Sequence, residues 1–228
     1  PKTGLVYIPA QETLFLYSTD KEFEYNPGTW NTAQINEMTY LPKDPDELAM
    51  VDSATIGYLL AWDPIAQREV WRAQYKRPWS GGVLSTDGNL VFQGTSDGRF
   101  VAYAADSGDL LWSMDTGQGI VAPPITYKID NEQYVAVQVG YGGVYALMGG
   151  FEAANENPER DGRMMVFKIG GEQLEKPIAS IAQLNPTIVE LNPDSLIIAQ
   201  GEYEYYQHCG VCHGLDAIGG GVLPDLRM

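Results

Sequence analysis

Two stretches of this chain repeat each other, and the repeat limits the folds that the chain can adopt. Residues 57–71, GYLLAWDPIAQREVW, align without gaps with residues 98–112, GRFVAYAADSGDLLW. A glycine, an alanine and a tryptophan recur at the same places, and the matching tryptophans Trp71 and Trp112 are 41 residues apart. An interval of roughly 40–45 residues is typical of a four-stranded β-propeller blade. The repeat therefore predicts at least two such blades.

Each repeat unit is expected to form a strand that ends at a small residue, a tight turn, and a strand that ends at tryptophan. The small residue is Ala61 in the first unit and Ala102 in the second. We expect it to leave room for an indole from the neighbouring blade. Burial of a Trp removes roughly 150–250 Å² from water, which is worth on the order of 4–6 kcal/mol at ~25 cal/mol/Å². One tryptophan per blade is therefore predicted to hold neighbouring blades together.

The region up to residue 170 is predicted to be all-β, with short strands between Gly, Pro, Asn and Asp turns. These strands are rich in Val, Leu, Phe and Tyr, and they are predicted at residues 4–10, 57–63, 89–95, 99–105, 134–140, 143–149 and 163–170. Residues 43–54 are expected to form one or two helical turns within a loop. The uncharged segment 134–151 has the length of a membrane span, but its five glycines and period-two alternation favour two strands. We predict no transmembrane segment.

The composition of the chain changes after Gly171. Residues 171–196 contain three prolines and no strong periodicity, which is typical of an extended linker. Residues 197–228 are predicted to begin a second, all-α domain, with a helix over residues 197–208. The predicted architecture is thus a partial propeller over residues 1–170, a linker, and the first part of a helical domain.

Both cysteines and both histidines of the chain lie between His208 and His213. The spacing Cys209-x-x-Cys212-His213 is the attachment motif for c-type haem. Two thiols about one helical turn apart can add to the two vinyl groups on one edge of the porphyrin, and the following imidazole can reach the iron. The sequence therefore predicts haem attachment at Cys209 and Cys212, with His213 as an axial ligand of the iron. His208 is expected to be a surface or packing residue.

Two other interpretations of this motif fit the sequence less well. A thioredoxin-like redox pair belongs in a βαβ unit, and no such unit is recognisable here. A structural zinc site needs four ligands, and His208 is too close to Cys209 to complete one. Cytochromes of this type usually have methionine as the second axial ligand, but Met228 is the only methionine after His213. We therefore expect the helical domain to be cut short.

The charge of the chain also excludes some partners. The net charge is −16 with a pI near 4.3, which argues against binding to nucleic acid. The hydrophobic fraction of 44% is that of a globular protein with a core. No signal peptide is recognisable after Pro1, as expected if a leader had been removed or the chain were a fragment.

The order of these parts resembles the quinohaemoprotein alcohol dehydrogenases. In that family an eight-bladed propeller holds pyrroloquinoline quinone (PQQ) and Ca²⁺, and a cytochrome c domain follows. The segments that carry the resemblance are residues 1–11, 59–64, 79–112, 209–214 and 220–227. The tryptophan-docking motif of the family is only partly kept, because Ala66-Gln67 replaces Thr-Gly in the first copy and Ala104 replaces Asp in the second. The resemblance implies that residues 1–170 are the C-terminal part of the propeller.

The resemblance implies a periplasmic enzyme that oxidises alcohols to aldehydes or ketones. Electrons would pass from PQQ to haem c and then to an external acceptor, such as a cytochrome, a copper protein or a quinone. The general base and the Ca²⁺ ligands of the family have no counterpart here, so no catalytic residue is assigned. We expect Asp52, Asp63 and Asp106 to be surface or turn carboxylates. A second hypothesis is a non-catalytic protein, either a haem c electron carrier or a propeller scaffold.

Three positions match residues that reach the quinone in the family. Trp79 and Ser80 correspond to a Trp-(Asn/Gly)-Gly-Gly stretch at the rim of the cofactor, and Val144 corresponds to a residue that closes the pocket. An indole beside a flat anionic quinone is suited to stacking and to N–H donation. Burial in an ordinary core is the alternative role for Trp79, and also for Val144.

Overall fold

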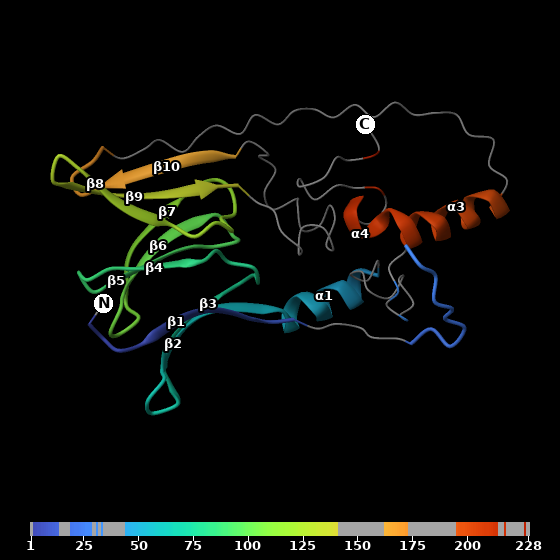
Figure 1. The fold of residues 1–228 in the computed structure, drawn as a ribbon, viewed down its shortest axis with the longest axis horizontal. Helices are drawn as coiled ribbons and strands as arrows, with labels where there is room; N and C mark the ends of the chain where they lie inside the picture. The colour runs from blue at the N-terminus through green and yellow to red at the C-terminus, as the bar shows by residue number, and fades with distance from the viewer. Residues whose placement is uncertain are drawn as a thin grey trace. The chain divides into compact units, whose positions relative to one another are not determined.

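The computed structural model describes residues 2–13, 19–28, 31, 33, 44–140, 162–172, 195–213, 217 and 226 (Figure 1). The chain divides into two compact units. The first unit comprises residues 1–13, 54–143 and 156–181, and the second comprises residues 14–53, 144–155 and 182–228.

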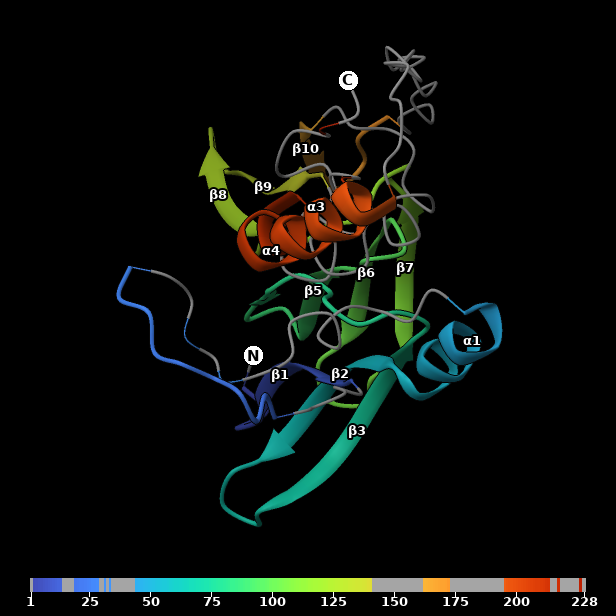
Figure 2. The same ribbon diagram turned by 90° about the vertical axis from the view of Figure 1, so that its right-hand side faces the viewer.

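The first unit contains three antiparallel sheets that follow one another along the chain (Figures 1 and 2). The first sheet has the order β1-β2-β3, the second β4-β5-β6-β7, and the third β10-β9-β8. Their strands are β1 (Val6–Glu12), β2 (Ile56–Asp63), β3 (Arg68–Tyr75), β4 (Val83–Ser85), β5 (Leu90–Gly94), β6 (Arg99–Ala104), β7 (Leu110–Asp115), β8 (Ile125–Ile129), β9 (Glu132–Val139) and β10 (Arg163–Lys168).

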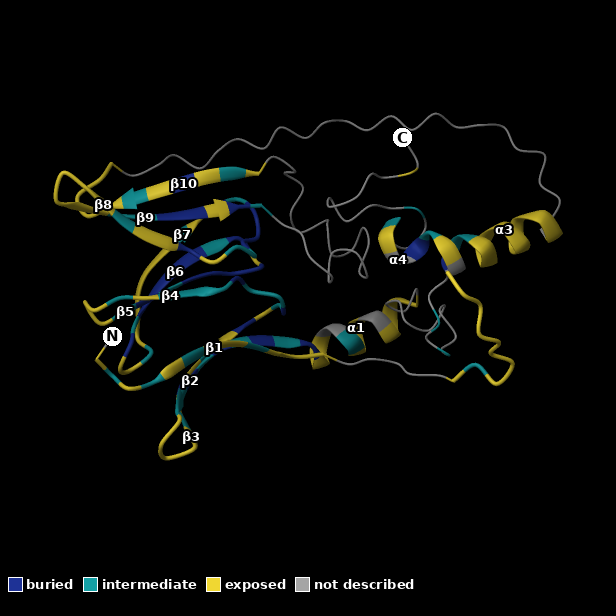
Figure 3. Ribbon diagram, viewed as in Figure 1, coloured by how far each residue is buried: buried dark blue, intermediate teal, exposed yellow. Residues whose placement is uncertain are grey.

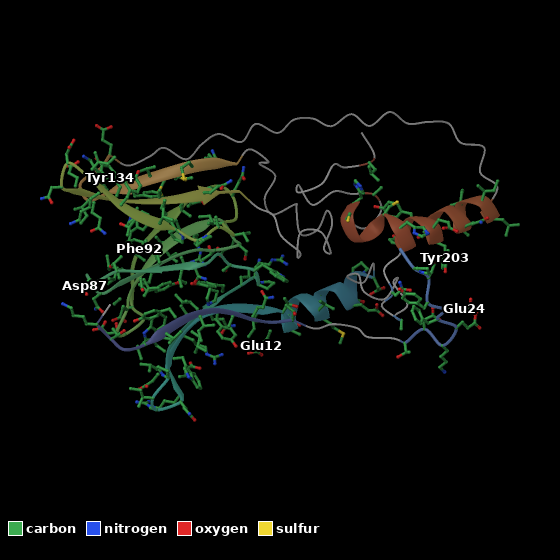
Figure 4. All side chains as sticks on the ribbon, in the orientation of Figure 1. Glu12, Glu24, Asp87, Phe92, Tyr134 and Tyr203 are labelled. Carbon is green, nitrogen blue, oxygen red and sulfur yellow. The ribbon has the colours of Figure 1, made fainter. Side chains whose placement is uncertain are left out.

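Two apolar layers separate the three sheets, and they contain most of the buried hydrophobic residues; Figure 3 colours buried segments dark blue. Side chains alternate between the two faces of a strand, so the middle sheet contributes to both layers. On β5, Val91 belongs to the layer shared with the first sheet, whereas Phe92 packs toward the third sheet. The Phe92 and Phe100 rings stack with centroids 5.9 Å apart, and Figure 4 labels Phe92. The middle sheet is thus apolar on both faces, as a propeller blade must be.

The repeat predicted from the sequence corresponds to equivalent hairpins. Strands β2 and β3 of the first sheet match β6 and β7 of the second, and the strand register shifts at the same place, after Ala61 and after Ala102. The tryptophans, however, do not end their strands. Strand β3 continues past Trp71 to Tyr75, and β7 continues past Trp112 to Asp115, because cross-strand pairing continues beyond each bulge.

Trp71 joins two sheets, as predicted, but the room for its indole comes from a different residue. Ala61 is the cross-strand partner of Trp71 within the same sheet. The indole of Trp71 lies against the turn after β6, where its Nε1 donates to the carbonyl oxygen of Ala105 at 3.0 Å. A Cβ atom on Gly108 would come within 2.6 Å of the ring. The neighbouring blade therefore accommodates the indole at Gly108.

The other predicted strands agree with the structure to within a few residues, except for 143–149, which lies outside the described residues. Strands β4 and β8 were not predicted. Helix α1 (Pro45–Ala54) is a ten-residue helix, longer than the one or two turns expected. Helix α3 (Ser195–His208) contains the helix predicted over residues 197–208, and α4 (Gly210–His213) follows it. In the described part of the chain, no helix combines the length and apolar character needed to span a membrane.

Candidate cofactor sites

The Cys-x-x-Cys-His motif lies where α3 passes into α4. The amide of Cys209 donates to the Tyr205 carbonyl at 2.7 Å, and the amide of His213 donates to the Cys209 carbonyl at 2.9 Å. These bonds span four residues, so the backbone stays helical through the motif. Cys209 and Cys212 are consequently about one turn apart. Their thiols are free, with Cys209 partly buried and Cys212 exposed.

This arrangement fits the covalent attachment of a haem. Two free thiols three residues apart on a helical backbone point to the same side, and the imidazole of His213 follows directly. His208 is exposed, and its Nε2 lies 3.3 Å from Oε2 of Glu204 one turn earlier on α3. That position is the one expected for a surface residue.

A second candidate site lies in the segment between β3 and β4. Trp79 has a backbone φ of +61°, a left-handed conformation that is rare for a bulky residue. Its amide donates to Oε1 of Gln11 at 3.0 Å. The indole of Trp79 is only partly buried, so Trp79 is not an ordinary core tryptophan like Trp71. Strained backbone of this kind is concentrated at ligand-binding positions.

Polar groups surround the residues that follow Trp79. The hydroxyl of Ser80 accepts a hydrogen bond from the amide of Ser96 at 3.4 Å. Ser96 is 3% exposed, and its own hydroxyl oxygen is buried with no hydrogen-bond partner. A buried hydroxyl without a partner is costly, unless a water or a ligand pairs with it. A partly buried tryptophan and the neighbouring Ser80 hydroxyl fit the edge of a flat, polar cofactor such as PQQ, whereas the Ser96 hydroxyl is enclosed by protein.

The carboxylates expected in turns are found there. Oδ1 of Asp63 accepts hydrogen bonds of 2.9 Å from the amides of Ile65 and Ala66 in the β2–β3 turn. Asp106 accepts a 2.8 Å hydrogen bond from the side-chain amide of Asn89, and this bond lowers the pKa of Asp106. Both carboxylates therefore have structural roles in turns.

The remaining site predictions are not located by the structure. Val144 and the side chain of Asp52 lie outside the part of the chain that the structure describes. Across the described ranges, no three His, Cys, Asp or Glu side chains are grouped closely enough to bind a metal ion. The sequence interpretation did not include Ser96. Its segment, TSDG, indicates only a turn, and its burial is visible only in the folded chain.

Comparison with known proteins shows which proteins this chain resembles. The β-propeller domain of PQQ-type glucose, ethanol and alcohol dehydrogenases matches residues 53–135. A quinohemoprotein alcohol dehydrogenase from Pseudomonas putida superposes with a TM-score of 0.84 at 36% identity, covering 100% of this chain and 33% of that protein. The corresponding enzyme from Comamonas testosteroni superposes with a TM-score of 0.68, also at 36% identity, covering 99% of this chain and 33% of that protein. Over its whole length, the chain is thus similar to these quinohemoprotein alcohol dehydrogenases.

The sequences of curated relatives agree with this assignment. The dehydrogenase subunit of a quinone alcohol dehydrogenase from Gluconacetobacter polyoxogenes is 38% identical over 100% of this chain and 31% of its own length. The 1-butanol dehydrogenase (cytochrome c) of Thauera butanivorans is 40% identical over 99% of this chain and 32% of its own length. The chain thus spans about a third of the length of these relatives, and it contains part of a PQQ-type propeller.

Proposed function

We propose that this chain is part of a periplasmic quinohemoprotein dehydrogenase that oxidises alcohols to aldehydes or ketones. Two observations carry the proposal: the similarity to a quinohemoprotein alcohol dehydrogenase over the whole chain, and the Cys-x-x-Cys-His motif in this sequence. When bound, PQQ would take two electrons from the alcohol, and haem c would pass them singly to an external acceptor. The Ca²⁺ ligands and the general base would lie outside this chain.

The residues of this chain would bind and orient the two cofactors. Cys209 and Cys212 would hold the haem through thioether bonds, and His213 would be an axial ligand of the iron. Trp79 would cover an edge of the quinone, and Ser80 would offer a hydroxyl group to one of its oxygens. Val144 is proposed to close the same pocket, by resemblance alone. The haem assignment is supported by the two free thiols about one turn apart, at the junction of α3 and α4.

A direct test uses the full-length protein, purified from a periplasm that contains the haem-attachment machinery. We expect a covalently bound haem, seen as a Soret band and as an increase in intact mass, and reduction of a dye by a primary alcohol after PQQ and Ca²⁺ are added. In Cys209→Ala/Cys212→Ala, the covalent haem should be lost. Attached haem without alcohol-dependent turnover would favour the non-catalytic electron carrier. If the full-length protein had no covalent haem and no alcohol-dependent turnover, the proposal as a whole would be contradicted.

A further inference from the structure

The segment that presents Trp79 and Ser80 is fixed from behind by a buried pair of polar side chains. We propose that Tyr75 and Gln93 are positioning residues for PQQ, which hold this segment through the carbonyl group of Gly81. This inference rests on the proposed function, because it concerns the same cofactor site. Neither residue corresponds to the cofactor-contact positions identified from the sequence.

The pair forms a chain of hydrogen bonds from one sheet to the next. The Tyr75 hydroxyl, at the end of β3, donates to Oε1 of Gln93 on β5 at 2.6 Å. Nε2 of Gln93 in turn donates to the carbonyl oxygen of Gly81 at 2.7 Å. Tyr75 is 3% exposed and Gln93 is completely buried. The chain therefore ends on the residue that directly follows Ser80.

The direction of each hydrogen bond in this chain is determined by its two ends. The carbonyl of Gly81 can only accept, so the NH₂ group of Gln93 must face it, and Oε1 must face Tyr75. Tyr75 must then be a donor, which requires a protonated phenol. Burial raises the pKa of Tyr75 well above its usual range, so the phenol stays protonated. The amide of Gln93 thus has one orientation, and Gly81 is held by one donor.

Gly81 itself has little freedom to move. Its amide donates to the Gly94 carbonyl at 2.8 Å, while its carbonyl accepts from Gln93. A Cβ atom at this position would lie 2.9 Å from the Ala122 carbonyl oxygen and 3.0 Å from that of Ile120. Both peptide groups of Gly81 are therefore fixed by hydrogen bonds. The positions of Trp79 and Ser80, which directly precede Gly81, are restricted as a result.

The equivalent segment in the second repeat lacks such a hydrogen-bonded pair of side chains. At the repeat interval of 41 residues, Thr116 takes the place of Tyr75 and Ile120 takes the place of Trp79. The hydroxyl of Thr116 is hydrogen-bonded at 2.9 Å to the carbonyl oxygens of Gln118, two residues on, and of Gly98, in the β5–β6 turn of the same sheet. Ile120 is completely buried. The Tyr75–Gln93 pair, which links two sheets, thus lies beside the partly buried Trp79. This is the place expected for residues that position the Trp79 segment.

The test compares Tyr75→Phe with Thr116→Val in the full-length protein, since each removes one buried hydroxyl at equivalent positions. The dissociation constant for PQQ is measured with Ca²⁺ present, and unfolding by urea is measured alongside. Tyr75→Phe should weaken PQQ binding by about tenfold, the factor that corresponds to one buried hydrogen bond of ~1.4 kcal/mol. Thr116→Val should destabilise the fold to a similar extent and leave PQQ binding unchanged. Equal PQQ affinities in the wild type and Tyr75→Phe, or equal losses in both variants, would overturn the proposal.

Hydrogen exchange without cofactor separates this inference from the proposed function. In the unliganded protein, Tyr75→Phe should accelerate amide exchange at residues 80–82 about tenfold, while Thr116→Val should not. If the wild type did not bind PQQ at all, the proposed function would fail, whereas faster exchange would still support the anchoring of the segment. Unchanged exchange would refute the anchoring itself. Should Tyr75→Phe not fold, the variant Tyr75→Phe/Gln93→Leu replaces it, because it removes the whole pair and leaves the Gly81 carbonyl, rather than the side-chain amide of Gln93, without this partner.

Discussion

The indole Nε1 of Trp71 donates a 3.0 Å hydrogen bond to the carbonyl oxygen of Ala105, which lies in the next sheet of the propeller. The turn that contains Ala105 also contains Gly108, whose missing side chain leaves the space for the ring. The indole is thus held by both polar and apolar contacts. Within the apolar layer between the first two sheets, this side chain thus contacts the backbone of one turn directly.

Gly108→Ala should therefore destabilise the first unit strongly. Gly108 has a φ of +78°, and an added Cβ would approach Cδ2 of Trp71 to 2.6 Å. The left-handed backbone and the overpacking together should lower the free energy of unfolding by about 2–4 kcal/mol. The matched control is Gly4→Ala, because Gly4 has a φ of +72° and no atom near its Cβ position. Urea unfolding should show a loss of only about 1 kcal/mol there, and equal losses would contradict this account of the turn.

The two repeated tryptophans should differ in their contribution to stability. Trp71 is 9% exposed and hydrogen-bonded, whereas Trp112 is 39% exposed and packs edge-on against Phe100 and Phe167. Trp71→Phe removes a buried hydrogen bond and leaves a cavity, so we expect a loss of about 2–3 kcal/mol. Trp112→Phe should cost under about 1 kcal/mol. Thermal and urea unfolding of both variants checks the order, and a larger effect at Trp112 would show that the order is wrong.

The buried phenol of Tyr75 should make the protein less stable at alkaline pH. Its pKa is raised in the folded state, chiefly by burial, so the folded chain keeps a proton that the unfolded chain loses above about pH 10. This contribution to stability is complete below the unfolded pKa and declines as the pH rises. The free energy of unfolding should then fall by about 1.4 kcal/mol per pH unit on account of Tyr75.

Urea unfolding between about pH 9 and 11.5 measures this effect. The pH slope of Tyr75→Phe should be shallower than that of the wild type by the stated amount. Tyr25→Phe is the control, because Tyr25 is 73% exposed, and its slope should match the wild type. Identical slopes in all three proteins would mean that the Tyr75 phenol is not buried in solution.

The effect of the left-handed backbone at Trp79 on stability should be separable from the effect of its side chain on PQQ binding. Trp79→Gly relieves a conformation that costs roughly 1 kcal/mol in a residue with a side chain, and it removes a partly buried ring. These effects oppose each other, so the free energy of unfolding should change by less than about 1 kcal/mol. Binding of PQQ to the full-length variant should weaken at least tenfold, because the indole is proposed to cover the cofactor. A large loss of stability with unchanged PQQ binding would identify Trp79 as a core residue.

Several parts of the fold could be predicted because they depend on local patterns. The strands β2, β5, β6 and β10 are rich in apolar residues and lie between clear turn signals, so the sequence predicts them to within a few residues. Strands β4 and β8 were missed because Val83–Ser85 is only three residues long and Ile125–Ile129 is half polar. Their pairing with β5 and β9 makes them strands, and a sequence pattern does not contain that information.

The two candidate sites also differ in how far the sequence alone could predict them. The haem-attachment motif is contiguous, so its residues are brought together by a single helical turn. The Trp79 segment was identified only by resemblance, and the contacts that hold it come from distant parts of the sequence. Gln11 is 68 residues before Trp79, Ser96 is 16 residues after Ser80, and Gln93 is 12 residues after Gly81. No periodicity in the sequence links these positions.

The sequence by itself determined the repeat unit, most of the strands among the described residues up to 168 and the position of the thiol pair, because these depend on neighbours along the chain. Tertiary structure decided which glycine accommodates Trp71, which buried hydroxyl lacks a partner, and which side chains anchor Gly81. The physical reason is that burial and hydrogen bonding act between atoms close in space. In a stack of sheets, those atoms belong to residues far apart in the chain.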